Sequence, residues 1–174
     1  TDLINTTHGW AWNLFANGAV NMIDTQRYPL SFNKNGSMCF WTNVSSGGPS
    51  SDVFYEGHST WCTNNCTVMN FGADEKINFQ SIESAGAFET AITYTIPNTG
   101  RPSHICASWG EGIGRFLYVN GQQVGSDTSS AGQRPLPVTQ NGKTLNFGSG
   151  GRYGAVNMQF DDIILYDRLL SSET

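Results

Sequence analysis

The segment Arg115-Phe-Leu-Tyr-Val-Asn-Gly-Gln-Gln-Val124 carries the clearest local folding signal in the chain. Two short runs rich in β-forming residues, 115–119 and 122–124, are separated only by Asn120 and Gly121. Asn-Gly supplies the two residues with positive φ that a type I′ turn requires, and that turn matches the twist of paired strands. The segment therefore predicts an antiparallel β-hairpin.

Alternation of apolar and polar residues extends this interpretation to most of the chain. In the run 88–96, Phe88, Ile92 and Ile96 fall on one face of a strand, while small and polar residues fall on the other. Further strands are expected at residues 37–44, 67–71, 76–82, 103–109, 144–147 and 158–166, and around Trp10 and Trp12. Turn-forming clusters at 45–51, 97–100, 126–137 and 148–151 separate them. So many short strands predict a two-sheet sandwich or a closed barrel, formed as one domain over residues 1–174.

The composition narrows the class of partner. The 174 residues carry a net charge of −5, and charged residues make up 13% against a usual value of about 25%. No basic field is present to hold phosphates, so nucleic acid is not an expected partner. No run reaches the roughly 20 apolar residues of a membrane span, and no signal peptide opens the chain. We expect a mature fragment or a domain cut from a longer protein.

Cysteines and glycosylation sequons point to the same compartment. The four cysteines permit three pairings, and their spacing favours disulfides over a zinc site, which usually needs Cys-x-x-Cys pairs. They are Cys39, Cys62, Cys66 and Cys106. The acceptor pattern Asn-x-Ser/Thr occurs at Asn5, Asn35, Asn43 and Asn65. Together these features predict a glycoprotein that is secreted or lies on the extracellular face of the cell.

Several segments resemble a known family. The run His104-Ile-Cys-Ala-Ser-Trp109, followed by a glycine turn and Phe116-Leu-Tyr-Val-Asn-Gly121, resembles the pentraxin and laminin G-like branch of the concanavalin A-like jelly rolls. Residues 37–41 resemble the family's early core strand, 145–148 a later strand, and 160–173 the closing strand with the start of a terminal helix. The resemblance covers about residues 15–174. It implies an all-β, two-sheet antiparallel jelly-roll sandwich.

The resemblance also implies a pairing of the cysteines. Cys39 and Cys106 lie in strands that the family places side by side, which leaves Cys62 and Cys66 to close a small loop.

Calcium is the cofactor that the resemblance raises. Pentraxins bind Ca²⁺ through an Asp-Asn pair and a later acidic loop, and the spacing places Asn64 and Asn65 at the first of these. The second position falls on residues 148–152, which contain no carboxylate. We therefore expect no metal or cofactor, and Asn64 and Asn65 stay as the calcium candidates.

Catalysis is not expected. The hydrolase branch of these jelly rolls uses the run Glu-x-Asp-x-x-Glu, and the chain has no such run. Asp161 and Asp162 are expected to begin a strand and to bond turn amides. His104 is expected to pack or hydrogen-bond beside the disulfide strand, and no Gly-x-Ser-x-Gly elbow is present.

Aromatic residues beside polar loops are the candidates for ligand binding, because sugar C–H faces stack on aromatic rings. Such residues lie in or beside two loops, the one that Cys62 and Cys66 would close and the glycine-rich one that includes residues 148–151. The candidates are Trp61, Asn64, Tyr55, Arg152 and Tyr153. The alternative is that Trp61 covers a Cys62–Cys66 bridge and Tyr153 caps a sheet edge. Trp41 and Trp109 are expected in the core, and a glycan on Asn65 would obstruct a site there.

Three functions follow from different features. The resemblance implies a non-catalytic recognition or adhesion module that binds a glycan or an extracellular protein. Low charge with abundant Asn, Ser and Thr also suits a self-assembling structural subunit of a coat or fibre, and hence a homo-oligomer. A glycoside hydrolase-like enzyme is the third alternative, and it predicts sugar release that falls when Asp161 or Asp162 is changed.

Overall fold

The computed structural model describes residues 2–6, 9–14, 20–24, 34–44, 51–57, 66–71, 76–84, 87–97, 101–136, 144–147, 149–150, 154–155 and 158–171. These residues form strands, turns and bends, and no helix occurs among them. Within these ranges, nothing helical is long and apolar enough to cross a bilayer.

Fifteen strands make up the described fold. They are β1 (Asp2–Thr6), β2 (Gly9–Leu14), β3 (Val20–Asp24), β4 (Asn35–Val44), β5 (Ser51–Gly57), β6 (Cys66–Phe71), β7 (Lys76–Ser84), β8 (Ala87–Thr95), β9 (Ser103–Gly110), β10 (Gly114–Val119), β11 (Gln122–Asp127), β12 (Thr144–Phe147), β13 (Ser149–Gly150), β14 (Gly154–Ala155) and β15 (Met158–Tyr166).

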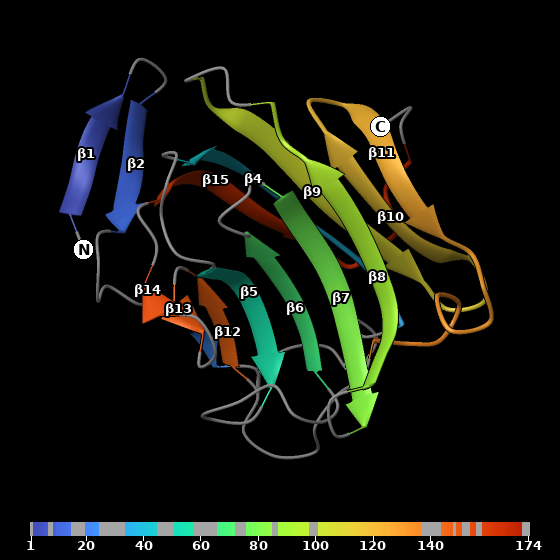
Figure 1. The fold of residues 1–174 in the computed structure, drawn as a ribbon. Coiled ribbons are helices and arrows are strands. Elements are labelled where there is room, and N and C mark those ends of the chain that lie inside the picture. The colour runs from blue at the N-terminus through green and yellow to red at the C-terminus, as the bar shows by residue number, and fades with distance from the viewer. Residues whose placement is uncertain are drawn as a thin grey trace.

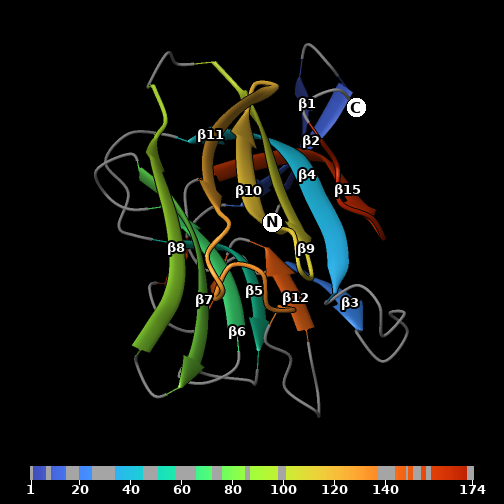
Figure 2. The same cartoon turned by 90° about the vertical axis from the view of Figure 1, so that its right-hand side faces the viewer.

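The strands form two stacked antiparallel sheets (Figures 1 and 2). One sheet has seven strands in the order β1-β2-β15-β4-β9-β10-β11, and the other has six in the order β3-β12-β5-β6-β7-β8. Strands β13 and β14 form a separate small hairpin. At one edge the sheets meet, because Gly125 of β11 lies against Ile92 of β8. The arrangement confirms the all-β jelly-roll sandwich and excludes the closed barrel.

The hairpin predicted from Asn120 and Gly121 is present. Strands β10 and β11 pair around these two residues, whose φ angles of 52° and 78° both lie in the left-handed region. The pairing shifts register between Leu117 and Tyr118, which marks a β-bulge.

The core lies between the two sheets, where alternate residues of each strand face inward. Phe40 of β4 and Ile105 of β9 are fully buried on one side, as are Ile77 and Phe79 of β7 on the other. Trp109 of β9 joins the layers, since its ring centroid lies 6.4 Å from that of Phe79. The expectation that Trp109 belongs to the core is confirmed.

The structure differs from the sequence prediction at Trp41 and after β15. Trp41 is 41% exposed, because Phe40 and Thr42 on either side of it take the core-facing positions of β4. The described residues after β15 form bends and irregular structure instead of a helix. Their backbone bonds to Ser37 of β4, as described below, and that tertiary contact replaces helical bonding.

Candidate functional site

The outer face of the seven-stranded sheet gathers the described residues with the most distinctive chemistry. Strands β4 and β9 pair so that Cys39 lies opposite Cys106, Trp41 opposite His104, and Ser37 opposite Ser108. In an antiparallel pair, residues directly opposite one another point to the same side of the sheet. The intervening Met38 and Phe40 are buried in the core. The three pairs therefore form one column on the side away from the core, which we call the outer column.

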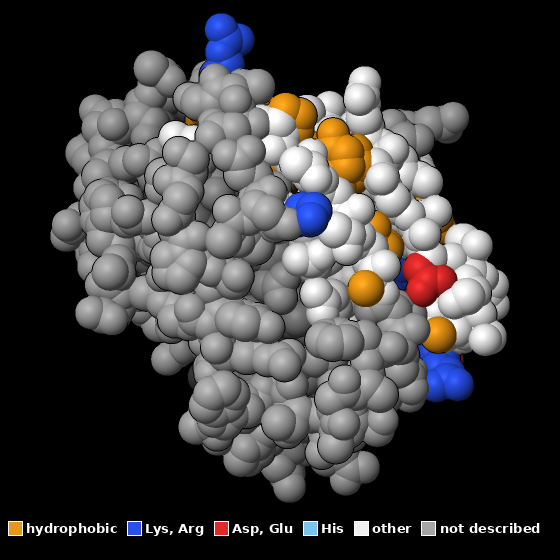
Figure 3. Space-filling model, in the orientation of Figure 1, with side chains coloured by type: hydrophobic (Ala, Val, Ile, Leu, Met, Phe, Trp, Pro, Cys, Tyr) orange, Lys and Arg blue, Asp and Glu red, His pale blue; other side chains and the backbone are white. Residues whose placement is uncertain are grey.

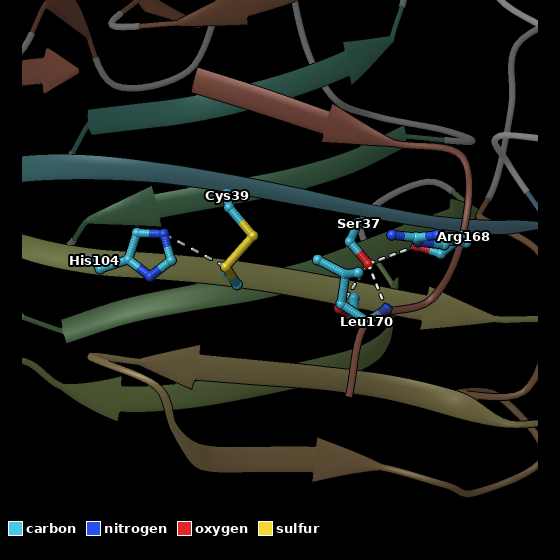
Figure 4. Close-up of a disulfide and its surroundings, with 7 residues drawn as sticks. Ser37, Cys39, His104, Arg168 and Leu170 are labelled. Atoms are coloured by element: carbon cyan, nitrogen blue, oxygen red, sulfur yellow. Dashed lines mark hydrogen bonds between the residues drawn. A yellow bond between two sulfur atoms is a disulfide. The ribbon is translucent and has the colours of Figure 1, made fainter. Parts of the chain in front are cut away.

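A disulfide forms the centre of the outer column (Figure 4). The Sγ atoms of Cys39 and Cys106 are 2.05 Å apart and the Cα atoms 4.1 Å apart, as in a non-hydrogen-bonded strand pair. This bond confirms the pairing that the family resemblance implied. Ile164 of β15 lies opposite Cys39, and Tyr118 of β10 lies opposite Cys106. Burial raises the pKa of the Tyr118 hydroxyl, so this ring stays neutral beside the disulfide.

A serine cluster closes one end of the outer column (Figure 4). Ser37 Oγ lies 2.8 Å from Ser108 Oγ and donates a hydrogen bond to the carbonyl of Arg168 at 2.8 Å. It also accepts a hydrogen bond from the amide of Leu170 at 2.9 Å. A hydroxyl has one proton and two lone pairs, so Ser108 is then the donor in the remaining bond. All three capacities of Ser37 are used, and they fix residues 168–170 against β4.

The other end of the outer column is formed by two ring side chains, those of Trp41 and His104, and the Trp41 ring is exposed to solvent. Trp41 has its ring centroid 5.1 Å from that of His104, with the planes tilted by 46°. On the opposite side, the register places Asp161 of β15 directly across from Trp41. His104, Trp41 and Asp161 thus form a row across β9, β4 and β15, which we call the tryptophan row. Its centre is an exposed indole flanked by two polar groups.

A β-bulge shapes the Asp161 side of the tryptophan row. The pairing of β15 with β4 shifts register between Asp161 and Ile164, and Asp162 has a φ of 48°. Asp161 Oδ1 accepts a hydrogen bond from the Asp162 amide at 2.9 Å. The two carboxylates therefore lie within β15, which begins at Met158, and the expectation that they start the strand is wrong. The expected bonds to turn amides are found only in part, because Asp161 accepts its bond from an amide inside the bulge of β15.

Backbone hydrogen bonds fix His104 at the β9 end of the tryptophan row, on the side of Trp41 opposite to Asp161. Its amide donates to Asn120 Oδ1 at 2.9 Å, and its carbonyl accepts from the Asn120 amide at 2.8 Å. The ring Nε2 lies 3.9 Å from Cys106 Sγ, so the expected position beside the disulfide strand is confirmed (Figure 4). Burial lowers the pKa of the His104 imidazole. A neutral ring offers one donor and one acceptor nitrogen.

This shift predicts a pH dependence of stability. The unfolded chain gains a proton on His104 below about pH 6.5, whereas the folded chain resists protonation until a lower pH. Above both pKa values, His104 is neutral in both states and does not change the free energy of unfolding. As the pH falls through the pKa of the unfolded chain, protonation favours the unfolded state and the fold loses stability. Urea midpoints at pH 7.5 and 5.5 should therefore fall more in the wild type than in His104→Gln. An equal fall in both proteins would contradict the prediction.

Cys39, His104 and Cys106 also stand out as a group with metal-ligand chemistry. Their ligand atoms all lie within 4.8 Å of one another. Metal ligation by cysteine uses the thiolate, and here both sulfurs are joined in the disulfide. The arrangement therefore serves as a structural tie in this oxidised form.

Most of the ligand-binding candidates selected from the sequence, and some of the other selected residues, lie outside the described ranges. Trp61, Cys62, Asn64, Asn65, Arg152 and Tyr153 are among them. Tyr55 lies in β5, opposite Val68 of β6 and Asn146 of β12, and Cys66 begins β6. The structure thus tests neither the Cys62–Cys66 bridge nor a site at Asn64. Of the sequon asparagines, Asn5 lies in β1, whereas Asn35 and Asn43 lie in β4, the former exposed and the latter half-buried.

A family model described as the concanavalin A-like lectin/glucanases superfamily, of the laminin G type, matches residues 16–174. The chain belongs to this family. The match agrees with the resemblance seen over residues 15–174. No curated protein matches this laminin G-like chain.

Solved structures show the same fold at low identity. The binding domain of botulinum neurotoxin DC in complex with rat synaptotagmin II superposes with a TM-score of 0.70 at 11% identity, over 99% of this chain and 43% of that one. Mouse laminin alpha1 domains LG4-5 superpose with a TM-score of 0.62 at 12% identity, over 87% of this chain and 40% of that one. The CBM40 of Ruminococcus gnavus IT-sialidase superposes with a TM-score of 0.62 at 12% identity, over 94% of both chains. The laminin G-like chain spans less than half the length of the first two.

Proposed function

We propose that the chain is a non-catalytic recognition module of a secreted or cell-surface protein, folded as one domain, and that it binds a glycan through the tryptophan row. The observation that carries this proposal is the 41% exposure of Trp41 on the rigid centre of a sheet. Structures with a similar fold include a receptor binding domain, laminin LG domains and a sialidase CBM40, which supports a recognition role.

The chemistry of the tryptophan row suits a sugar. An indole face attracts the C–H groups of a pyranose, and polar groups at its rim bond the hydroxyls. The neutral imidazole of His104 and the carboxylate of Asp161 supply such groups on opposite sides of Trp41. The disulfide and the paired strands hold all three in place, so little entropy is lost on binding.

A glycan fits better than a broad protein contact. Large hydrophobic side chains that are exposed in the described ranges are Trp41, Ile113 and Ile164. Ile113 lies in the turn between β9 and β10, away from Trp41 along the sheet. Ile164 lies opposite Cys39, so it is the one exposed large apolar neighbour of Trp41 on the outer face among the described residues. This apolar surface is small, whereas the core of a protein interface is broad and continuous.

The charges favour a neutral sugar over an acidic one. The side chain facing Trp41 from β15 is a carboxylate, and the chain carries a net charge of −5. The face seen in Figure 3 is that of the six-stranded sheet, opposite to the tryptophan row, and the described Lys and Arg side chains on it stand apart from one another. A sialylated or sulfated glycan would meet repulsion at this row. We propose neutral hexose-containing glycans as the ligand class.

The acidic residues support binding over hydrolysis. Glycosidases place two carboxyl groups on either side of the scissile bond. Asp161 and Asp162 are consecutive in one bulge, and Asp161 uses one oxygen on the Asp162 amide. Their arrangement suits a hydrogen-bond acceptor at the rim of the tryptophan row.

Replacing Trp41 by alanine should abolish most glycan binding. Loss of the stacking surface is expected to weaken affinity about tenfold or more. The measurement is retention on a glycan array, followed by calorimetry with the best neutral hit, using protein made without N-glycosylation. Ile113→Ala is the matched control, because it removes an exposed apolar side chain outside the row. Equal binding by Trp41→Ala and wild type, or a preference for sialylated ligands, would overturn the assignment.

Glycan-array binding and the oligomeric state in solution also test two alternatives for this surface, a protein ligand and self-assembly. Failure to bind any glycan, together with capture of a defined extracellular protein that is lost in Trp41→Ala, would assign the surface to a protein ligand. Polymers that grow with concentration in light scattering would favour the structural subunit. Both outcomes would contradict the proposal of a glycan-binding module.

A further inference from the structure

Asn43 lies on the same strand and the same face as Trp41. Strand β4 alternates, and Thr42 between them is buried at 2% exposure, so Asn43 points to the outer side with Trp41. Its side chain is half-buried, and its register partner is Gln159 of β15. In the sequence, Asn43-Val44-Ser45 is an N-glycosylation sequon.

The spacing suits a contact between an attached sugar and the indole. Two residues along a strand are separated by roughly 6.6 Å, which is about the length of one pyranose linked through the asparagine side chain. A sugar that leaves Asn43 along the outer face of β4 is therefore within reach of the exposed part of Trp41. Burial of a sugar face on the ring would also account for a large aromatic side chain at an outward position.

We propose that Asn43 is N-glycosylated from a lipid-linked oligosaccharide donor, its Nδ2 losing a proton and bonding C1 of the first N-acetylglucosamine as the bond from C1 to the lipid pyrophosphate breaks. We propose further that this sugar stacks on Trp41, so that glycosylation hinders the access of external ligands to the tryptophan row. The stacking stands on the geometry of β4 alone. Its role in regulating ligand access rests on the proposed function.

Asn35 provides an internal comparison on the same strand. It lies at the start of β4, is exposed, and belongs to the sequon Asn35-Gly36-Ser37. Its next neighbour on the outer face is Ser37, which is buried in the serine cluster, and its register partner on β9 is Gly110. A glycan on Asn35 therefore has no aromatic ring two residues along its face. Only the Asn43 glycan should couple energetically to Trp41.

The experiment is a double-mutant cycle on protein from cells that perform N-glycosylation. Mass spectrometry of the peptide containing Asn43 should find it occupied. Removing that glycan by Asn43→Gln should lower Tm by about 2–4 °C, and Ser45→Ala, which keeps the asparagine, should do the same. In the Trp41→Ala background, neither change should move Tm further. Asn35→Gln should have the same effect whether or not Trp41 is present.

A second measurement, the affinity for the neutral glycan, distinguishes failure of this inference from failure of the proposed function. Glycosylated wild type should bind the neutral glycan about fivefold more weakly than Asn43→Gln from the same cells. If protein without N-glycans binds no glycan, the proposed function fails, while a positive cycle still supports stacking. If Asn43 is unoccupied, or if Asn43→Gln and Trp41→Ala act additively on Tm, the stacking is overturned whatever the ligand.

Discussion

Replacing Cys39 and Cys106 together by alanine is expected to lower the free energy of unfolding by about 4 kcal/mol. The two cysteines are 67 residues apart in sequence, and a cross-link of that span removes much of the conformational entropy of the unfolded chain. For a protein of this size, the loss corresponds to a fall in Tm of roughly 8–16 °C. The double variant can still form the native pairing of β4 and β9, because the disulfide joins residues that the strand register already places opposite one another.

Chemical denaturation of the two proteins, with and without a thiol reductant, measures the effect. Reductant should destabilise the wild type strongly. In the double variant, any remaining effect of reductant isolates a bridge between Cys62 and Cys66, so the same experiment tests that pairing. A difference below about 1 kcal/mol between the oxidised wild type and the double variant would contradict the predicted contribution of the outer column.

The strands predicted best are those whose own residues determine them. Alternation placed β12 and β15 at the bounds that the structure shows, and the Asn120-Gly121 pair fixed the β10–β11 hairpin. In β8, buried Ile92 and exposed Ala91 and Thr93 follow the predicted faces. Local propensity is sufficient here because the turn chemistry and the apolar pattern agree.

Other elements depend on partners distant in the sequence. Strand β5 follows a cluster of Ser, Gly and Pro that favours turns, yet it pairs with β6 on one side and β12 on the other. Strand β3 pairs with β12, more than one hundred residues away. The terminal residues resembled the start of a helix, but bonds from Ser37 to Arg168 and Leu170 hold them in another form. Such contacts leave no local pattern in the sequence.

The candidate site was missed for a related reason. Phe40 and Trp41 are consecutive aromatic residues in a strand, so only one of them can face the core. The sequence does not say which, because either assignment buries a large ring. The register decides it: Cys39 bonds Cys106 on the outer face, and Trp41 has the same parity as Cys39. This parity places Trp41 on the surface and Phe40 in the core.

Replacing Trp109 by alanine is expected to cost about 3–5 kcal/mol of folding free energy. The side chain is 1% exposed and its ring contacts Phe79 of the opposite sheet, so truncation leaves a cavity between the layers. Urea unfolding, monitored by circular dichroism so that loss of a fluorophore does not interfere, gives the change directly.

Trp41→Ala is the matched control, since it removes the same atoms from the neighbouring strand. Its indole is 41% exposed on the outer face, and the expected loss of stability is roughly 1 kcal/mol or less. The two substitutions should thus separate cleanly, with Trp109→Ala impairing the fold and Trp41→Ala impairing ligand binding. If both cost the same stability, Trp41 would be a core residue after all. The tryptophan row would then lose its exposed centre, because a ring that is needed to hold the sheets together is not free to receive a sugar.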